Sequence, residues 1–475
     1  MRLRILFSAS IILAILFLLF CSQSSATRSR LSAMGDLSIV IEDESNMINL
    51  WDFARNPAAF LYDERGSVLR GDFVWEAHQI DSLPFYDHLL YYYQGVPYLP
   101  RFKFQANGDL HNNWGSMSLR REGDFAVSMG GDYLLRQTDS EHDRSQIDRP
   151  NFQLVLSKSI NSQTSCGFNL RYMRCDFEYT RIEDYWTRDM IHWTKESIED
   201  IQAEAGVRSK FSPGFILGAA AGYKRVDMTG HNRDHTREGN HYGFLFNTSS
   251  ASRIVWVSGQ SVVEVEGKIK LATEWTVKLL NNKGSSEGNK RRFCLRLRAL
   301  YRPFSRLRLG VYFSDGDSHI EANDPVYSYY SSIRDSTSTR ELGGGFALRL
   351  GKRILTGIEY HYSDYPQPRY NVYYPGNLRT HSVHAGVETQ LSEALFCRAG
   401  YSNTTVVWEP NQLERRNSWE NSLSLGLGFE PLESDLIFEL SCRYSLRKYK
   451  DWFYNWDVPS RTLTFSASGK KRFWD

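Results

Sequence analysis

The sequence is poor in cysteine, and its cysteines follow no spacing typical of a metal site. Six cysteines occur in 475 residues, and no two of them form a CxxC pair. Five follow the N-terminal apolar run, which is an odd number. This pattern argues against a structural zinc site. We expect the five cysteines to lie in strands as small apolar residues with unpaired thiols. The five are Cys166, Cys175, Cys294, Cys397 and Cys442.

Catalytic motifs are also missing. The sequence has no nucleophile elbow, no HExxH and no glycine-rich loop followed by a phosphate-binding lysine. His231, His235 and His241 lie in a polar stretch, where solvated histidines are commoner than metal ligands. The acidic stretch 314–324 lacks the spacing of a calcium loop. We therefore expect that the protein is not an enzyme and has no cofactor, no catalytic site and no metal site.

Neither sign of charge dominates, and long apolar runs are almost absent. The 57 basic and 55 acidic residues nearly cancel, so we expect no nucleic-acid-binding surface. The mean hydropathy of −0.46 excludes a bundle of membrane-spanning helices. It does not exclude a transmembrane barrel, because only alternate residues of each barrel strand need be apolar.

The one long apolar run, residues 5–20, follows two arginines and precedes small residues at 24–26. This order predicts that residues 1–26 are a secretory signal peptide. The alternative is a lipoprotein signal with Cys21 as the lipidated residue, but Phe20 is bulkier than the residue usually found before such a cysteine. A retained anchor would be short for a membrane span.

Alternation between apolar and polar residues is abundant, and it is clearest in residues 422–445. Leu423, Leu425, Leu427 and Phe429 alternate with Ser424, Gly426, Gly428 and Glu430. After a break at 431–435 the alternation returns. Period two on both sides of a turn predicts a β-hairpin. Its apolar face would meet a second sheet in a soluble sandwich, or lipid in a transmembrane barrel.

Similar strand-like runs fill the chain from about residue 68 onward. Tight connections such as 212–214 alternate with long polar ones such as 138–150, 181–197 and 229–240. Short turns at one end and long loops at the other are typical of outer-membrane barrels. The absence of a linker and of a fixed repeat argues against several soluble domains and against a propeller. We expect an all-β fold, a transmembrane antiparallel β-barrel of roughly 14 to 18 strands.

The residues after the predicted signal peptide differ from the rest of the chain. Met34-Gly35-Asp36 comes first, then the acidic residues 42–44, then Asn56-Pro57-Ala58. This order resembles the N-terminal segment of the FadL-like outer-membrane transporters and the related PorV-type barrels. In those families the segment folds inside the barrel as a plug or hatch. The resemblance implies a hatch at 27–64, marked by Gly35, Asn56 and Pro57, and a barrel at 65–475. Asp36 stands where these families often have a second glycine.

If the apolar faces meet lipid, the opposite faces line the lumen. They carry charges of both signs, which we expect to form cross-strand ion pairs. The densest basic group is Arg296, Arg298, Arg306 and Arg308, which a tight turn would bring together. We hypothesise that this lumenal basic patch attracts an anionic head group or a carboxylate.

The resemblance implies passive transport of small hydrophobic molecules across the outer membrane of a Gram-negative-type bacterium. The implied partners are outer-membrane lipid, the barrel-assembly machinery and a small hydrophobic ligand. The first alternative is a non-transporting, secretion-associated barrel that binds or shuttles partner proteins. The second is an exported soluble all-β protein that binds carbohydrate through its many aromatic residues, which make up 14% of the chain.

Overall fold

The computed structural model describes most of the chain after the predicted signal peptide. The described residues are 30, 33–37, 56–59, 67–85, 102–121, 125–140, 143–185, 188–236, 246–284, 287–323, 333–366, 377–411, 414–431, 436–451 and 456–473. The predicted signal peptide and most of the predicted hatch, including 38–55, lie outside the described residues.

The described chain contains eighteen strands and one short 3-10 turn, η2 (Pro57–Ala59). The strands are β1 (Ser67–Phe85), β2 (Phe102–Arg121), β3 (Phe125–Ser140), β4 (Asp143–Ser159), β5 (Thr164–Tyr185), β6 (Arg188–Ser212), β7 (Phe215–Thr236), β8 (Phe246–Val265), β9 (Ile269–Gly284), β10 (Glu287–Phe304), β11 (Leu307–Asn323), β12 (Ile333–Leu350), β13 (Ile354–Pro366), β14 (Asn377–Gln390), β15 (Leu395–Asn411), β16 (Glu414–Phe429), β17 (Leu436–Asp451) and β18 (Trp456–Phe473).

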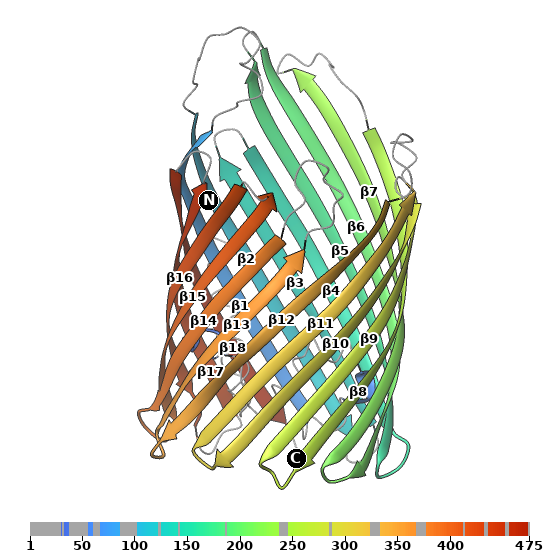
Figure 1. Cartoon of the computed structure of the whole chain (residues 1–475), viewed down its shortest axis with the longest axis vertical. Coiled ribbons are helices and arrows are strands. Elements are labelled where there is room, and N and C mark those ends of the chain that lie inside the picture. Colours follow the sequence, from blue (N-terminus) through green and yellow to red (C-terminus); the bar gives the residue numbers. More distant parts are fainter. Residues whose placement is uncertain are drawn as a thin grey trace.

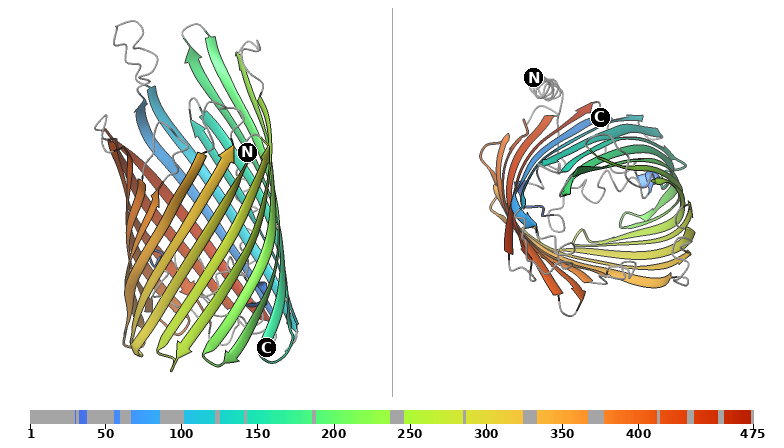
Figure 2. Two further views of the ribbon diagram at one scale, coloured as in Figure 1. Left: turned by 45° about the vertical axis from the view of Figure 1, so that its right-hand side comes forward. Right: turned by 90° about the horizontal axis from the view of Figure 1, so that it is seen from above.

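The strands form one closed antiparallel barrel (Figures 1 and 2). Each strand pairs with the next in sequence, and β18 returns to pair with β1, where Ser67 lies opposite Phe473. At this seam the rings of Trp75 and Phe465 stack with their centroids 5.6 Å apart. Closure leaves no free sheet edge, which a lipid-exposed sheet requires because lipid cannot satisfy backbone hydrogen bonds. The predicted transmembrane barrel is confirmed, with a strand number at the top of the expected range.

The two faces of the barrel wall have opposite chemistry. On β16 the side chains of Leu423, Leu425 and Leu427 are 64%, 66% and 50% exposed, whereas Ser422 and Ser424 are both 3% exposed. The apolar residues therefore point out of the barrel and the small polar ones into it. An apolar outer surface of this kind suits lipid and would be costly in water. It argues against the soluble, carbohydrate-binding alternative.

Aromatic residues border the apolar outer surface. Phe211 and Phe304, 60% and 71% exposed, lie beside short turns at one end of the barrel. At the opposite border of the apolar surface, the Tyr401 hydroxyl donates to Asn421 Oδ1 over 2.8 Å, and the Tyr360 hydroxyl lies 2.8 Å from His381 Nδ1. A ring that has an apolar body and a polar tip favours the membrane–water boundary.

All connections are short at the end of the barrel that holds the first residues of β1 and the last residues of β18 (Figure 1), and the long ones, such as those from β1 to β2 and from β7 to β8, are at the opposite end. Tight connections there include residues 213–214, 305–306 and 351–353. In outer-membrane barrels the short turns face the periplasm, so the opposite, long-loop end faces outward.

The prediction of long loops at 138–150, 181–197 and 229–240 is wrong over most of these residues. The pairing of β3 with β4 continues to Asp139 and Arg144, and that of β5 with β6 to Tyr185 and Arg188. β5, β6 and β7 have 22, 25 and 22 residues and rise beyond their neighbours (Figure 1). Beyond the membrane both faces of a strand meet water, so the apolar–polar alternation that marks a strand disappears.

Candidate functional site

The described part of the N-terminal segment, namely Arg30, 33–37 and 56–59, lies inside the barrel. Figure 2 shows its two parts against opposite walls of the lumen. One part contacts β13–β17 and the other contacts β4–β7. The expected fold, with an N-terminal segment folded into the lumen, is therefore present.

Small residues form the wall on which the first part rests. Strand pairing aligns one residue from each of five neighbouring strands into a lateral row, which we name the first small-residue row. Its members are Gly357 on β13, Gly386 on β14, Gly400 on β15, Ser424 on β16 and Arg443 on β17. Four of the five positions carry almost no side chain, so a second backbone can lie directly on the sheet.

The backbone of Met34 and Gly35 fills the space that these residues leave. A Cβ atom at Gly386 would overlap the Met34 carbonyl, and one at Gly400 would overlap the Gly35 nitrogen. The opposing atoms are backbone and cannot move aside. Gly35 and Asp36 both have positive φ angles, of 73° and 67°. Glycine adopts this left-handed conformation without strain, and aspartate tolerates it better than most residues do.

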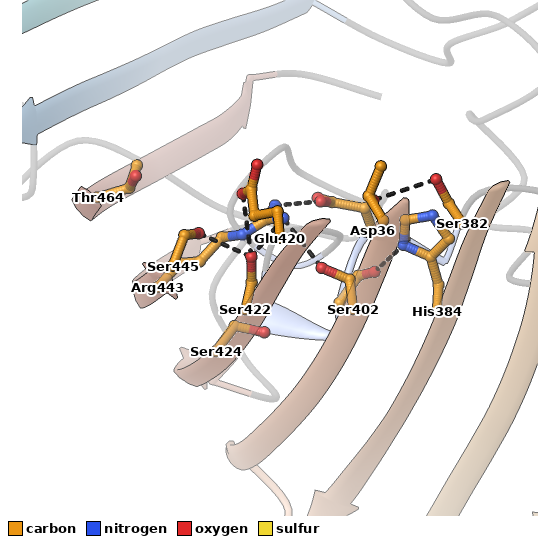
Figure 3. A network of polar contacts seen from close by, with 12 residues as sticks. Asp36, Ser382, His384, Ser402, Glu420, Ser422, Ser424, Arg443, Ser445 and Thr464 are labelled. Carbon is orange, nitrogen blue, oxygen red and sulfur yellow. Dashed lines mark hydrogen bonds and ion pairs between the residues drawn. The ribbon is translucent and has the colours of Figure 1, made fainter. Parts of the chain in front are cut away.

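Polar contacts fasten this backbone to the wall. The Ser424 hydroxyl donates to the Ala33 carbonyl over 3.2 Å, and His384 Nδ1 lies 2.7 Å from the Gly35 carbonyl. Because that carbonyl can only accept, His384 carries its proton on Nδ1. The Arg443 guanidinium pairs with Asp36. It also donates to the hydroxyls of Ser402 and Ser422 over 3.0 and 3.1 Å (Figure 3).

A second ionic contact joins Arg30 to the same wall. Its guanidinium donates two hydrogen bonds to the Glu388 carboxylate, over 2.7 and 2.8 Å. Arg398 donates to the same carboxylate over 2.6 Å and pairs with Glu439 at 2.9 Å. Arg398 and Glu439 are nearly buried. The expected cross-strand ion pairs are thus present, and they extend to the N-terminal segment.

Apolar side chains complete the first contact. Met34 and Leu37 are fully buried and pack with Ala347 and Leu355, while Tyr312 packs against the same cluster. Among the described residues, these side chains form the buried apolar cluster of the lumen. Two of its four buried members come from the N-terminal segment and two from the barrel wall.

The second part of the segment rests on a matching row of small residues. Strand pairing aligns Ser157 on β4, Gly167 on β5, Gly206 on β6, Ala220 on β7 and Ser258 on β8, which we name the second small-residue row. Cβ atoms at Gly167 and Gly206 would meet Pro57 and Asn56.

Asn56 both shapes and anchors this part. Its Oδ1 accepts a hydrogen bond from the Ala58 backbone nitrogen over 3.1 Å, which closes an Asx-type turn. Its Nδ2 donates to the Val207 carbonyl over 3.2 Å. The Ser165 hydroxyl donates to the Ala58 carbonyl over 2.8 Å. The side chains that could make both kinds of contact from this position are few, which explains an asparagine here.

The predicted hatch residues Gly35, Asn56 and Pro57 therefore all lie at contacts between the segment and the wall. Their gating role stays a prediction. Sequence reasoning missed Arg30 and Asp36 as wall contacts, and it gave no role to the glycines of the barrel wall. A lateral row of small residues has no local signal, because its members are far apart in the chain and meet only through strand register.

The predicted basic patch is spread along the wall. Arg296 lies opposite Ser314, and Ser314 is six positions from Arg308 along β11. The Arg296 guanidinium is 3.7 Å from the Glu274 carboxylate. Arg306 is exposed in the turn, while Arg298 and Arg308 are half-buried on the strands. Arg302 on β10 lies nearer to Arg308 than Arg296 does. Attraction of anions by this group stays a hypothesis.

Among the described residues, no group of three or more His, Cys, Asp and Glu is placed to hold a metal ion. His231 is exposed, the His235 side chain is not described, and His241 lies outside the described residues. The described chain also has no helix that is long and apolar enough to cross a membrane.

No protein-family model matches the sequence, and no curated protein matches it. Solved structures do match. The ferric preacinetobactin receptor BauA of Acinetobacter baumannii is similar with a TM-score of 0.50 and 10% identity, over 86% of this chain and 80% of that one. A Pseudomonas aeruginosa FadL homologue matches with a TM-score of 0.45 and 14% identity, over 96% and 100% of the two chains. The Pseudomonas putida toluene transporter TodX matches with a TM-score of 0.41 and 11% identity, over 94% and 98%. At these identities the likeness concerns the fold, which is that of outer-membrane β-barrels.

Proposed function

We propose that the protein is an outer-membrane channel for small hydrophobic molecules and that its N-terminal segment is the gate. The observation that carries the proposal is the pair of small-residue rows. Each row accepts backbone of the segment against the lumenal wall, and the two rows lie on opposite sides of the lumen (Figure 2). The described parts of the segment occupy space at both lumenal walls and so narrow the path that a solute would take.

The contacts are suited to a gate because they are specific and individually weak. The first part is held by two ion pairs and a few hydrogen bonds, and the second by two hydrogen bonds to the wall. A hydrogen bond contributes on the order of 1 kcal/mol net, and a partly exposed ion pair about as much. Release of one part therefore costs far less than unfolding the barrel, whose strands stay paired.

The apolar cluster supports a hydrophobic substrate. Leu37 and Met34 occupy an apolar site on the wall formed by Ala347, Leu355 and Tyr312. A hydrophobic molecule of similar size would bury the same surface and would compete with Leu37 for it. Substrate binding would then displace the segment at the point where it blocks the lumen, which couples entry to opening.

One observation favours the partner-binding alternative. β5, β6 and β7 extend beyond the membrane, and on this extension Trp193 Nε1 donates to the Glu178 carboxylate over 3.0 Å. A paired, aromatic-bearing sheet above the membrane could hold another protein. The two functions are separable, because the extension and the small-residue rows share few residues.

The proposal is tested by Gly400→Ala, whose new methyl group would overlap the backbone of Met34 and Gly35. Gly316→Ala is the matched control, since that lumenal glycine borders Thr339 and strand backbone and not the N-terminal segment. Both proteins must first show heat-modifiable migration in SDS gels as evidence of a folded barrel.

We expect Gly400→Ala to raise single-channel conductance and the cellular uptake of the apolar fluorophore phenylnaphthylamine, with Gly316→Ala unchanged. A rise in conductance without a rise in fluorophore uptake would support a gate and reject the hydrophobic substrate. Unchanged conductance in a folded Gly400→Ala protein would reject the gate.

A further inference from the structure

Arginines mark the outer rim of the apolar surface on one side of the barrel. On β7, β8 and β10 the outward-facing residue just beyond the last apolar one is Arg225, Arg253 or Arg291. They follow Tyr223, Val255 and Phe293, which are 41%, 48% and 46% exposed. On β9, which lies between β8 and β10, the corresponding residue is the exposed Asn281. This rim lies toward the long-loop end and therefore at the outer leaflet.

Carboxylates on the described chain balance only one of these arginines. Arg225 Nε lies 2.8 Å from Asp227 Oδ2. Arg253 lies directly opposite Arg225 in the pairing of β7 with β8. Arg253 and Arg291 are exposed, and neither has an ion pair or hydrogen bond among the described residues. Like charges opposite each other across a strand pair destabilise it, so this arrangement favours a bound anion.

Two arginines at the same level elsewhere on the barrel have carboxylate partners. On β5, Arg174 follows Tyr172, and its Nε lies 3.0 Å from Asp176 Oδ2. On β12, Arg340 Nε lies 3.5 Å from Asp315 Oδ1. Arginines without a carboxylate partner are therefore a feature of the β8–β10 side, and an arginine at this boundary can also be paired.

We propose that Arg253 and Arg291, with Arg225 beside them, bind the phosphate groups of a glycolipid in the outer leaflet. The guanidinium group matches phosphate oxygens in a bidentate geometry, and it holds its charge at any physiological pH. Below the arginines, the exposed side chains of Val257 and Leu279 continue the apolar surface on which acyl chains would lie. That continuity selects a lipid over free phosphate, since a soluble anion would gain nothing from the apolar surface.

The test compares the full-length protein with the double variant Arg253→Gln/Arg291→Gln and with Arg174→Gln as control. Arg174 is an exposed boundary arginine of the same kind, but it has a carboxylate partner. Binding is measured by native mass spectrometry and by the unfolding temperature in phosphatidylcholine vesicles. The vesicles contain either bisphosphorylated lipid A or the same lipid without its phosphates. Heat-modifiable migration confirms that each variant is folded.

We expect the unaltered protein to prefer the phosphorylated lipid, and the double variant to lose roughly tenfold or more of that binding. Arg174→Gln should bind as the unaltered protein does. Equal binding of the two lipids, unchanged binding by the double variant, or an equal loss in Arg174→Gln would overturn the proposal. Displacement of the lipid by inorganic phosphate alone would also overturn it, because the site would then recognise phosphate without the lipid.

Discussion

At the residue scale, the contact between the N-terminal segment and the wall depends on a few positions where nearly every other side chain would overlap the segment or not reach it. Gly386 and Gly400 admit backbone against the wall because they have no Cβ. Arg443 reaches from the wall to Asp36 and at the same time donates to two serines. The contacts with residues 34–36 join positions more than 350 apart in the chain, so they hold the segment through the closed barrel and not through local structure.

The pair of Asp36 and Arg443 allows a double-mutant cycle. Both side chains are partly exposed, at 41% and 21%, so water screens their attraction. We expect Asp36→Asn to raise the fraction of open time in single-channel recordings about two- to fivefold. Arg443→Gln should do the same, and the double variant should add little. Fully additive effects would mean that the two residues do not act through each other.

Glu388 is expected to matter to the barrel more than to the gate. Its carboxylate lies between Arg30 and Arg398, whose side chains are 16% and 5% exposed. Glu388→Gln would leave the guanidinium groups of Arg30 and Arg398 side by side without the carboxylate that they share. We expect a loss of about 3 kcal/mol in the free energy of unfolding, measured by urea titration in vesicles. Arg30→Gln, which leaves the Arg398–Glu439 pair intact, should cost much less. Equal losses would place the effect in the N-terminal segment.

At the element scale, the sequence predicts a strand best where the membrane supplies the contrast between its faces. β16 and β17 were predictable because Leu423, Leu425 and Leu427 meet lipid while Ser422 and Ser424 line the lumen. The outer halves of β5, β6 and β7 were not, because both of their faces meet water. Gly35, Asn56 and Pro57 could be recognised by resemblance. The small-residue rows could not, since they exist only once strand register is known.

The extension of β5 and β6 should be dispensable for folding. Replacing residues 178–195 by an Asn-Gly turn would connect Phe177 to Glu196, which already lie opposite each other. The removed part lies beyond Tyr172, where the apolar outer surface of β5 ends. We expect heat-modifiable migration and channel conductance to be retained. Loss of the folded barrel would contradict this, whereas loss of a bound partner protein alone would support the partner-binding alternative.

At the scale of the whole molecule, the side chains of the barrel are sorted by whether they face outward or into the lumen. Apolar side chains cover the outside, small and charged ones line the lumen, and the N-terminal segment contacts both lumenal walls (Figure 2). The first small-residue row lies on β13–β17 and the second on β4–β8. In the proposed channel, opening requires that the segment leave the first small-residue row, where Leu37 lies in the apolar cluster.

A reversible cross-link between segment and wall tests this claim most directly. Leu37 Cδ1 lies 3.2 Å from the position that a Cβ at Gly357 would take, so two cysteine side chains placed there have room to meet without overlap. In a protein whose five described free cysteines are replaced by serine, Leu37→Cys and Gly357→Cys should form a disulfide. We expect conductance and fluorophore uptake to be low when the cross-link is oxidised and to rise on reduction, with neither single cysteine variant responding. Equal conductance before and after reduction of a formed cross-link would contradict the account, because the channel would then open with its N-terminal segment in place.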